Sequence, residues 1–196
     1  MAHNTTMKAR FIIATAIAAL VALPVLAMKG NVDSGLQPGA TIIPFHPDHI
    51  SGPLAGTTNC FPCTYGNRPA VQAWVHGEDM KVVSKIIAEL QEGIDNNKDK
   101  EFKGMLVMVL DTEGQRATAK KALMDAVNSE KAKDVAVALV TKEHEAVKDY
   151  KINLDPAVKS TIFFYKNRKI SDTIVNLKAD TDGCTGLCEK IATLLK

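Results

Sequence analysis

Two unbroken apolar runs constrain the fold of this chain most. The first is Met105–Leu110 (MLVMVL) and the second is Val135–Val140 (VAVALV). Runs of this length are typical of strands buried on both faces, as in a parallel sheet. Parallel strands need long crossover connections, which are usually helices. The two runs therefore predict an α/β fold with helices on both faces of its sheet.

The segments between and around these runs supply the other elements. Asp79–Ile94 carries its apolar residues on one helical face, and Ala117–Val127 repeats that pattern. The remaining expected elements are an extended piece at Thr41–Phe45, a strand at Ala70–Val75, a short helix at Glu143–Tyr150, strands at Thr161–Tyr165 and Thr173–Leu177 joined by a tight antiparallel connection, and a last helix from about Thr185. Glycines and prolines crowd residues 45–69, so we expect a long ordered loop or an irregular hairpin there.

The N-terminus has the three-part layout of a secretory signal. Lys8 and Arg10 precede an apolar run at Phe11–Ala27, which ends in small residues at the usual cleavage positions. We expect a signal peptide over residues 1–27, and hence export to the periplasm or secretion, with no stable membrane span after cleavage. The alternative is an uncleaved anchor. Residues 28–40 lack an apolar period and are expected to form a flexible lead-in.

The charge balance argues against two classes of partner. Removing residues 1–27 leaves 22 of the 24 basic residues against 22 acidic ones, so the mature chain has no formal net charge. A neutral chain with mixed charges offers no electrostatic footprint for nucleic acid or for an anionic membrane. We therefore expect neither as a partner.

The cysteine pair Cys60-Phe61-Pro62-Cys63 has the spacing of a redox dithiol. It is expected to be either a dithiol that turns over, with Cys60 as the nucleophile, or a structural disulfide in an oxidising compartment. Gly66 and Pro69 disfavour a helix after Cys63 that would stabilise a thiolate. Arg68, which follows the pair closely, is the candidate to replace that helix.

The other two cysteines, Cys184 and Cys188, are spaced four residues apart at the start of the last expected helix. In an exported protein we expect them to form a disulfide with each other. Pairing across to Cys60 or Cys63 stays open, because four cysteines allow three connectivities.

A metal site is the third interpretation of these residues. The four cysteines resemble zinc ligands, and His46 and His49 could add imidazole nitrogens. Export disfavours stable thiolates, so we expect no metal. No glycine-rich phosphate-binding motif is present either, so no nucleotide cofactor is expected.

The order of elements resembles the thioredoxin-like fold in its exported redoxin form, which includes TlpA-type thiol–disulfide proteins and peroxiredoxins. Tyr150–Ile170 (YKINLDPAVKSTIFFYKNRKI) is similar to the thioredoxin segment around the cis-proline strand. Cys60–Val75 (CFPCTYGNRPAVQAWV) is similar to a motif of secreted thioredoxin-like proteins from planctomycete-type bacteria. The resemblance covers residues 41–196, and it implies a thioredoxin-like domain there and thiol–disulfide proteins as partners.

Two positions depart from the family pattern. The family's cysteine pair follows the first core strand, where this chain has His76-Gly77-Glu78-Asp79. His76 is therefore either a site residue, such as a general base, or a plain polar residue at a strand end. Ser160 occupies the family's cis-proline position, and we expect a trans peptide bond there because a cis bond before a non-proline residue is costly.

Overall fold

The computed structural model describes residue 1, residues 33–178 and residues 181–196, without the side chains of residues 181–185. The expected signal peptide and the first part of the expected lead-in lie outside the described residues.

Within the described residues, six strands form one mixed sheet in the order β1-β4-β3-β2-β5-β6. Their bounds are β1 (Asp48–Ser51), β2 (Ala70–His76), β3 (Lys103–Leu110), β4 (Ala136–Thr141), β5 (Ser160–Lys166) and β6 (Lys169–Val175). The two apolar runs fall on β3 and β4, which are neighbouring parallel strands as predicted. β2 joins β3 in parallel, and β1, β5 and β6 run antiparallel to their neighbours.

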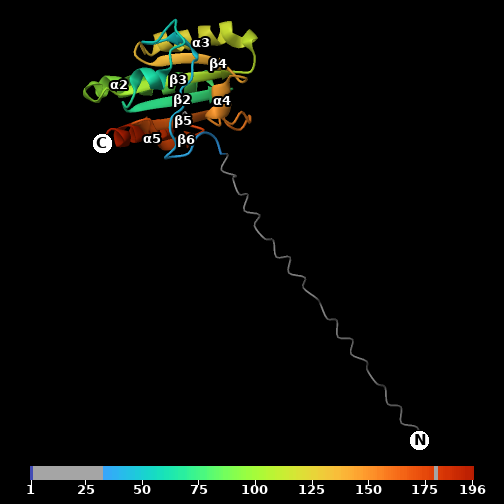
Figure 1. The fold of residues 1–196 in the computed structure, drawn as a ribbon. Coiled ribbons are helices and arrows are strands. Elements are labelled where there is room, and N and C mark those ends of the chain that lie inside the picture. Colours follow the sequence, from blue (N-terminus) through green and yellow to red (C-terminus); the bar gives the residue numbers. More distant parts are fainter. Residues whose placement is uncertain (2–32, 179–180) are drawn as a thin grey trace. The chain divides into compact units, whose positions relative to one another are not determined.

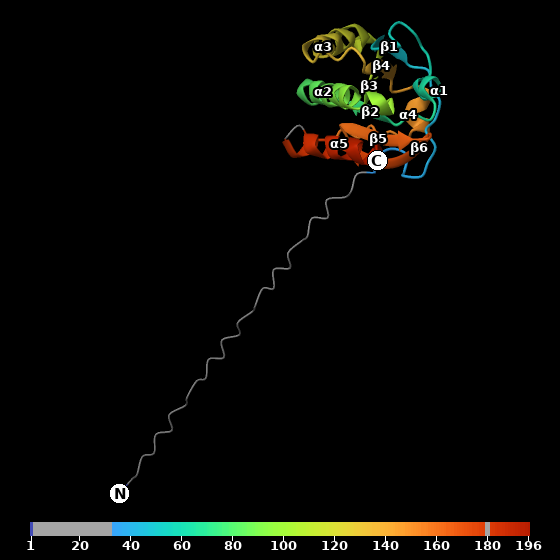
Figure 2. The same cartoon turned by 90° about the vertical axis from the view of Figure 1, so that its left-hand side faces the viewer.

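Helices cover both faces of this sheet (Figures 1 and 2). They are α1 (Phe61–Tyr65), α2 (Met80–Asn96), α3 (Arg116–Ser129), α4 (Glu145–Asp149) and α5 (Thr181–Leu194), with single 3₁₀ turns η1 (Lys98–Lys100) and η2 (Glu113–Gln115). Helices α2, α3 and α5 pack on one face, and α1 and α4 pack on the other. The sandwich matches the expected α/β class.

The side chains of the central strands divide between two cores. On β2, Val71, Ala73 and Val75 face the core formed with α2, α3 and α5. The intervening residues Ala70 and Trp74 face the core on the opposite side of the sheet. Successive strand residues point to opposite faces, so a strand buried on both sides is mostly apolar. This is why Met105–Leu110 of β3 and Ala136–Val140 of β4 read as apolar runs, whereas β2 is interrupted by Gln72, which is 0% exposed.

Several element bounds differ from expectation. Thr41–Phe45 forms only an isolated bridge, from Thr41 to Lys169, and the first strand is β1 further along. β6 begins at Lys169 rather than Thr173. Its connection to β5 is the tight turn Asn167-Arg168, in which both residues have positive φ. Helix α5 begins at Thr181, four residues earlier than expected.

β1 belongs to the irregular hairpin that was one of the two expectations for this stretch. The N–H of His49 donates to the carbonyl of Thr57 at 3.0 Å, so the chain returns alongside β1. Gly52 makes the turn possible because its φ is +81°, and an added Cβ would lie 2.2 Å from the carbonyl oxygen of Val135. The hairpin leads the chain directly to Cys60.

The described part of the lead-in, residues 33–40, packs against the sheet. Leu36 is buried, and the Ser34 hydroxyl lies 2.6 Å from that of Thr161. The N–H of Gly35 donates to the carbonyl of Lys151 at 2.9 Å. These contacts add the segment to the face that also carries α1 and α4.

Among the described residues, no helix has both the length and the apolar character needed to cross a membrane.

The double burial of the central strands gives a direct prediction. Leu106 on β3 is 0% exposed. Replacing it with alanine should lower the free energy of unfolding by about 2–5 kcal/mol, because it removes buried methyl groups and leaves a cavity. Urea denaturation measures the change.

The matched control is Thr118→Ala on the exposed surface of α3, which should change the free energy of unfolding by no more than about 0.5 kcal/mol. A loss below about 1 kcal/mol for Leu106→Ala would contradict the position of this side chain in the core.

Candidate functional site

Cys60 and Cys63 form a disulfide, with their Cα atoms 5.2 Å apart. The two residues differ sharply in exposure, because Cys60 is buried at 5% and Cys63 is exposed. The prediction of Cys60 as the nucleophile rests on the premise that the N-terminal sulfur of such a pair is the more exposed. The structure reverses that order of exposure.

A short helix carries the pair, and it begins before Cys63 rather than after it, where Gly66 and Pro69 disfavour one. α1 begins at Phe61, ahead of Cys63, so Pro62 falls in the first turn, where its missing N–H costs no hydrogen bond. Gly66, with a φ of 63°, ends the helix after five residues.

Cys60 caps this helix through its sulfur. The backbone N–H of Cys63 donates to Cys60 Sγ at 3.2 Å. The Cys60 carbonyl accepts from both the backbone N–H and the hydroxyl of Thr64, each at 2.9 Å. The buried cysteine is therefore held by the backbone of its own loop, and its sulfur already has a hydrogen-bond donor.

Aromatic side chains fix α1 on the sheet. Phe61 is 1% exposed and belongs to the core that contains Trp74 and Phe45. The ring of Tyr65 stands edge-on to that of Phe61, with centroids 4.8 Å apart. Lys103 places its ammonium group 5.3 Å from the centroid of Tyr65, within the range of a cation–π contact. The buried side of α1 is anchored, and Cys63 lies on its exposed side.

Two histidines hold the segment just before Cys60. His46 Nδ1 lies 3.0 Å from the carbonyl of Thr58, and His49 Nε2 lies 2.9 Å from the carbonyl of Asn59. A carbonyl only accepts, so each of these ring nitrogens carries a proton and donates. The sequence offers both histidines as candidate metal ligands. Their actual contacts depend on how the hairpin folds back, which no sequence spacing indicates.

His49 is held in its neutral form. It is 3% exposed, and its Nδ1 atom is buried without a hydrogen-bond partner. Burial lowers the pKa of His49 and outweighs the raising effects of the Asn59 carbonyl and of Asp48. Protonation at Nδ1 would place an uncompensated charge beside the segment that carries Cys60.

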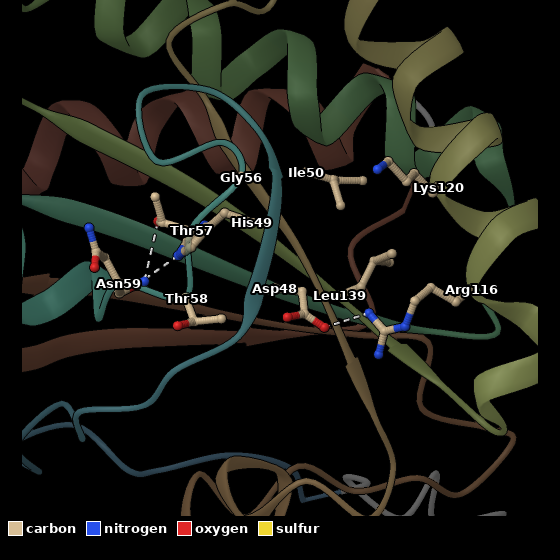
Figure 3. A pocket seen from close by; sticks show the side chains of 10 residues that line it. All are labelled: Asp48, His49, Ile50, Gly56, Thr57, Thr58, Asn59, Arg116, Lys120 and Leu139. Carbon is tan, nitrogen blue, oxygen red and sulfur yellow. Dashed lines mark hydrogen bonds and ion pairs between the residues drawn. The ribbon is translucent and has the colours of Figure 1, made fainter.

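The same segment forms one wall of a cavity of about 630 Å³ (Figure 3). Thr57, Thr58 and Asn59 line it from the hairpin, while Arg116 and Lys120 line it from α3. An ion pair between Arg116 and Asp48, at 2.8 Å, joins α3 to β1 at its edge. The cavity therefore adjoins the chain immediately ahead of the disulfide.

The other candidate residues make contacts elsewhere. The Arg68 guanidinium donates to the Tyr65 carbonyl at 3.2 Å and to Glu101 at 3.0 Å. His76 Nε2 lies 3.0 Å from a carboxylate oxygen of Asp111, which follows β3. No hydrogen bond joins Arg68 or His76 to either sulfur in the part of the chain that the structure describes. The roles assigned to them in the site remain predictions.

Ser160 is the first residue of β5, one residue before the expected start of that strand. Its peptide bond is trans, as predicted, and the residue is 1% exposed. Its hydroxyl accepts a hydrogen bond from the N–H of Leu177 at 2.9 Å. Ser160 pairs with Val75 across the sheet, next to the junction where the family's cysteine pair would lie.

The second cysteine pair is described only in part. Cys188 is exposed on α5, and its sulfur donates a hydrogen bond to Glu89 on α2. The side chain of Cys184 lies outside the described residues, so the Cys184–Cys188 disulfide stays a prediction. The backbone of α5 is helical through both positions.

Among the side chains that the structure describes, no three histidine, cysteine, aspartate or glutamate residues gather closely enough to hold a metal ion. Both cysteines of the CxPC segment are engaged in their disulfide.

Comparisons with known proteins identify the fold. No protein-family profile matches the chain, and no curated protein matches it. Among solved structures, the thioredoxin domain of a thiol-disulfide oxidoreductase from Bacteroides vulgatus matches 82% of this chain and 99% of its own, at 14% identity and a TM-score of 0.57. A putative thiol:disulfide interchange protein DsbE from Chlorobium tepidum matches 82% of this chain and 99% of its own, at 13% identity and a TM-score of 0.58.

A thiol peroxidase from Chromobacterium violaceum also matches, over 82% of this chain and 88% of its own, at 11% identity and a TM-score of 0.51. Proteins with different activities thus share this architecture, and one fold hosts many functions. The likeness establishes that the chain has a thioredoxin-like fold, as its sequence predicted.

The buried neutral His49 gives a prediction about pH. Because the pKa of His49 is lower in the folded chain than its ordinary value of 6.5, the unfolded chain binds the extra proton first. The free energy of unfolding should therefore fall as the pH drops below about 6.5, and this contribution should be complete above that value. Urea denaturation between about pH 8 and pH 5 measures the slope.

The control is His49→Gln, whose amide nitrogen can still donate to the Asn59 carbonyl but does not titrate. The pH slope of this variant should be shallower than that of the wild type. Identical slopes would contradict the burial of a neutral imidazole at this position.

Proposed function

We propose that this chain is an exported thioredoxin-like protein that exchanges disulfides with other proteins through Cys60 and Cys63. One observation carries the proposal. A disulfide with CxxC spacing lies on the surface of a thioredoxin-like fold with one cysteine exposed and the other hydrogen-bonded through its sulfur. Exchange proceeds by attack of a thiolate on an accessible disulfide sulfur, and it requires this kind of exposure.

The short loop between the cysteines argues against a mainly structural bridge. A disulfide stabilises a protein by restricting its unfolded chain, and the effect grows with the length of the closed loop. The loop from Cys60 to Cys63 spans a sequence separation of three residues. The chain-entropy relation gives about 2 kcal/mol for so short a loop, at the low end of the usual range. Phe61 and Tyr65 already anchor α1, so the bridge is not the main contact that holds this helix on the sheet.

The Cys63 N–H supports redox chemistry at Cys60. When the disulfide opens, Cys60 Sγ can become a thiolate that already faces this donor at 3.2 Å. A hydrogen bond to an ionised acceptor is roughly twice as strong as one between neutral groups. The reduced state therefore gains an interaction that the oxidised state has only weakly.

A second candidate is a non-catalytic thioredoxin-like domain that uses its disulfides as staples. The sequence after β2 favours it, because His76-Gly77-Glu78-Asp79 holds no cysteine where the family's reactive pair would lie. In that case the domain would act by binding, and the Cys60–Cys63 bridge would stay oxidised throughout. The two candidates differ in whether the Cys60–Cys63 disulfide is reduced and re-formed during the protein's function.

Export belongs to the proposal as well. The layout of residues 1–27 is that of a secretory signal, and disulfides persist in oxidising compartments such as the periplasm. Other thiol and disulfide proteins of that compartment are the proposed partners. The similarity to secreted planctomycete-type proteins in Cys60–Val75 is consistent with this location.

The experiment is the reduction of insulin by dithiothreitol in the presence of the protein. The wild type should accelerate the reaction, because an exposed disulfide relays electrons faster than direct attack on insulin. Cys60→Ser and Cys63→Ser should each return the rate to that of dithiothreitol alone, since both sulfurs are needed. Turbidity of the precipitating insulin chains is the readout.

The matched control is the double variant Cys184→Ser/Cys188→Ser, which removes the other two sulfurs and should keep the wild-type rate. A wild type that does not accelerate insulin reduction would support the non-catalytic domain and contradict the exchange function.

A further inference from the structure

The two sulfurs of the pair occupy different environments, and this difference has a chemical consequence. Cys60 is 5% exposed at the start of α1, behind the anchored side of the helix, while Cys63 is exposed. An incoming thiolate must approach a disulfide sulfur along the line of the S–S bond, so the shielded sulfur is the poorer target. The greater exposure of Cys63 therefore favours attack of the partner thiolate at this sulfur.

The hydrogen bond from the Cys63 N–H to Cys60 Sγ also favours attack at Cys63. Cys60 Sγ accepts from the Cys63 N–H, so this sulfur has a donor ready when it leaves as a thiolate. The better-stabilised thiolate is the better leaving group in disulfide exchange. The hydrogen bonds from His46 and His49 to the carbonyls of Thr58 and Asn59 hold the backbone just before Cys60 in place.

We propose that Cys63 is the sulfur that forms the mixed disulfide with the partner and that Cys60 is the leaving and resolving thiol; this rests on the proposed exchange function. A partner thiolate attacks Cys63 Sγ, the new partner–Cys63 bond forms, and the Cys60–Cys63 bond breaks with its electron pair on Cys60. A second partner thiolate then attacks the partner's sulfur in the mixed disulfide. Cys63 leaves as a thiolate, the partner has lost two electrons as a disulfide, and the protein holds both as a dithiol.

The reverse reaction uses the same mixed disulfide. Reduced Cys63 attacks a partner disulfide and releases one partner thiolate. Cys60 then attacks Cys63, which re-forms the internal bond and expels the second partner thiolate. Cys63 forms the mixed disulfide with the partner in both directions, and Cys60 stays buried at the start of α1.

The test compares the two sulfurs one at a time. In the background that lacks Cys184 and Cys188, the variants Cys60→Ser and Cys63→Ser each keep a single cysteine of the pair. Serine at position 60 can still accept the N–H at position 63, so the helix cap is kept. Oxidised glutathione is the probe, and mass spectrometry follows glutathionylation over time. Cys63 in the first variant should react at least about tenfold faster than Cys60 in the second.

A wild-type measurement covers the case in which a variant folds poorly. The oxidised wild type is mixed with reduced glutathione, the reaction is stopped with acid, and peptide mass mapping locates the bound glutathione. Glutathione on Cys63 supports the proposed order. Equal rates for the two variants, or glutathione on Cys60 in the wild type, would overturn it.

The order of attack and the exchange function can each be refuted without refuting the other. Glutathione on Cys60 in a protein that reduces insulin would refute the order of attack and leave the function intact. Glutathione on Cys63 in a protein that does not accelerate insulin reduction would support the order of attack and refute the function.

Discussion

The burial of the central strands on both faces is the constraint on which the rest of the structure depends. The side chains of β2, β3 and β4 are largely apolar on both faces, so each face of the sheet needs a cover. α2, α3 and α5 are long enough to cover one face. The other face receives the short helices α1 and α4 together with non-helical segments that contribute Leu36 and Phe45. The cysteine pair lies on this second face because Phe61, between the two cysteines, is part of its cover.

That placement explains why the two cysteines differ. The side of α1 that packs on the sheet carries Phe61 and shields Cys60, whereas the opposite side leaves Cys63 in solvent. Packing thus creates a chemical asymmetry within four residues. A cysteine pair at the junction after β2 would have had the longer helix α2 behind it. Here the N–H of Cys63 donates to Cys60 Sγ, while His46 and His49 hold the preceding backbone through its carbonyl groups.

The sequence predicted the elements whose signals are local and long. β3 and β4 follow from their apolar runs, and α2 follows from its periodicity. The structure adds a cap that this periodicity does not show, since Asp79 accepts a hydrogen bond from the Lys81 N–H at 2.8 Å. The sequence did not predict α1, because five residues are too few to show a helical period. Pro62 also indicates a break in a helix unless the helix begins just before it. The contacts of His49 escaped prediction for another reason. They form only when the hairpin brings Asn59 back to β1, and no spacing in the sequence records that return.

The central claim is that the Cys60–Cys63 bridge is an exchange pair rather than a staple, and its reduction potential tests this most directly. The potential follows from equilibration with redox buffers and quantification of the Cys60–Cys63 peptide by mass spectrometry. We expect a value above about −300 mV, in the range of exchange proteins, because the reduced state gains the hydrogen bond at Cys60. A value below about −300 mV is that of structural disulfides and would contradict the account.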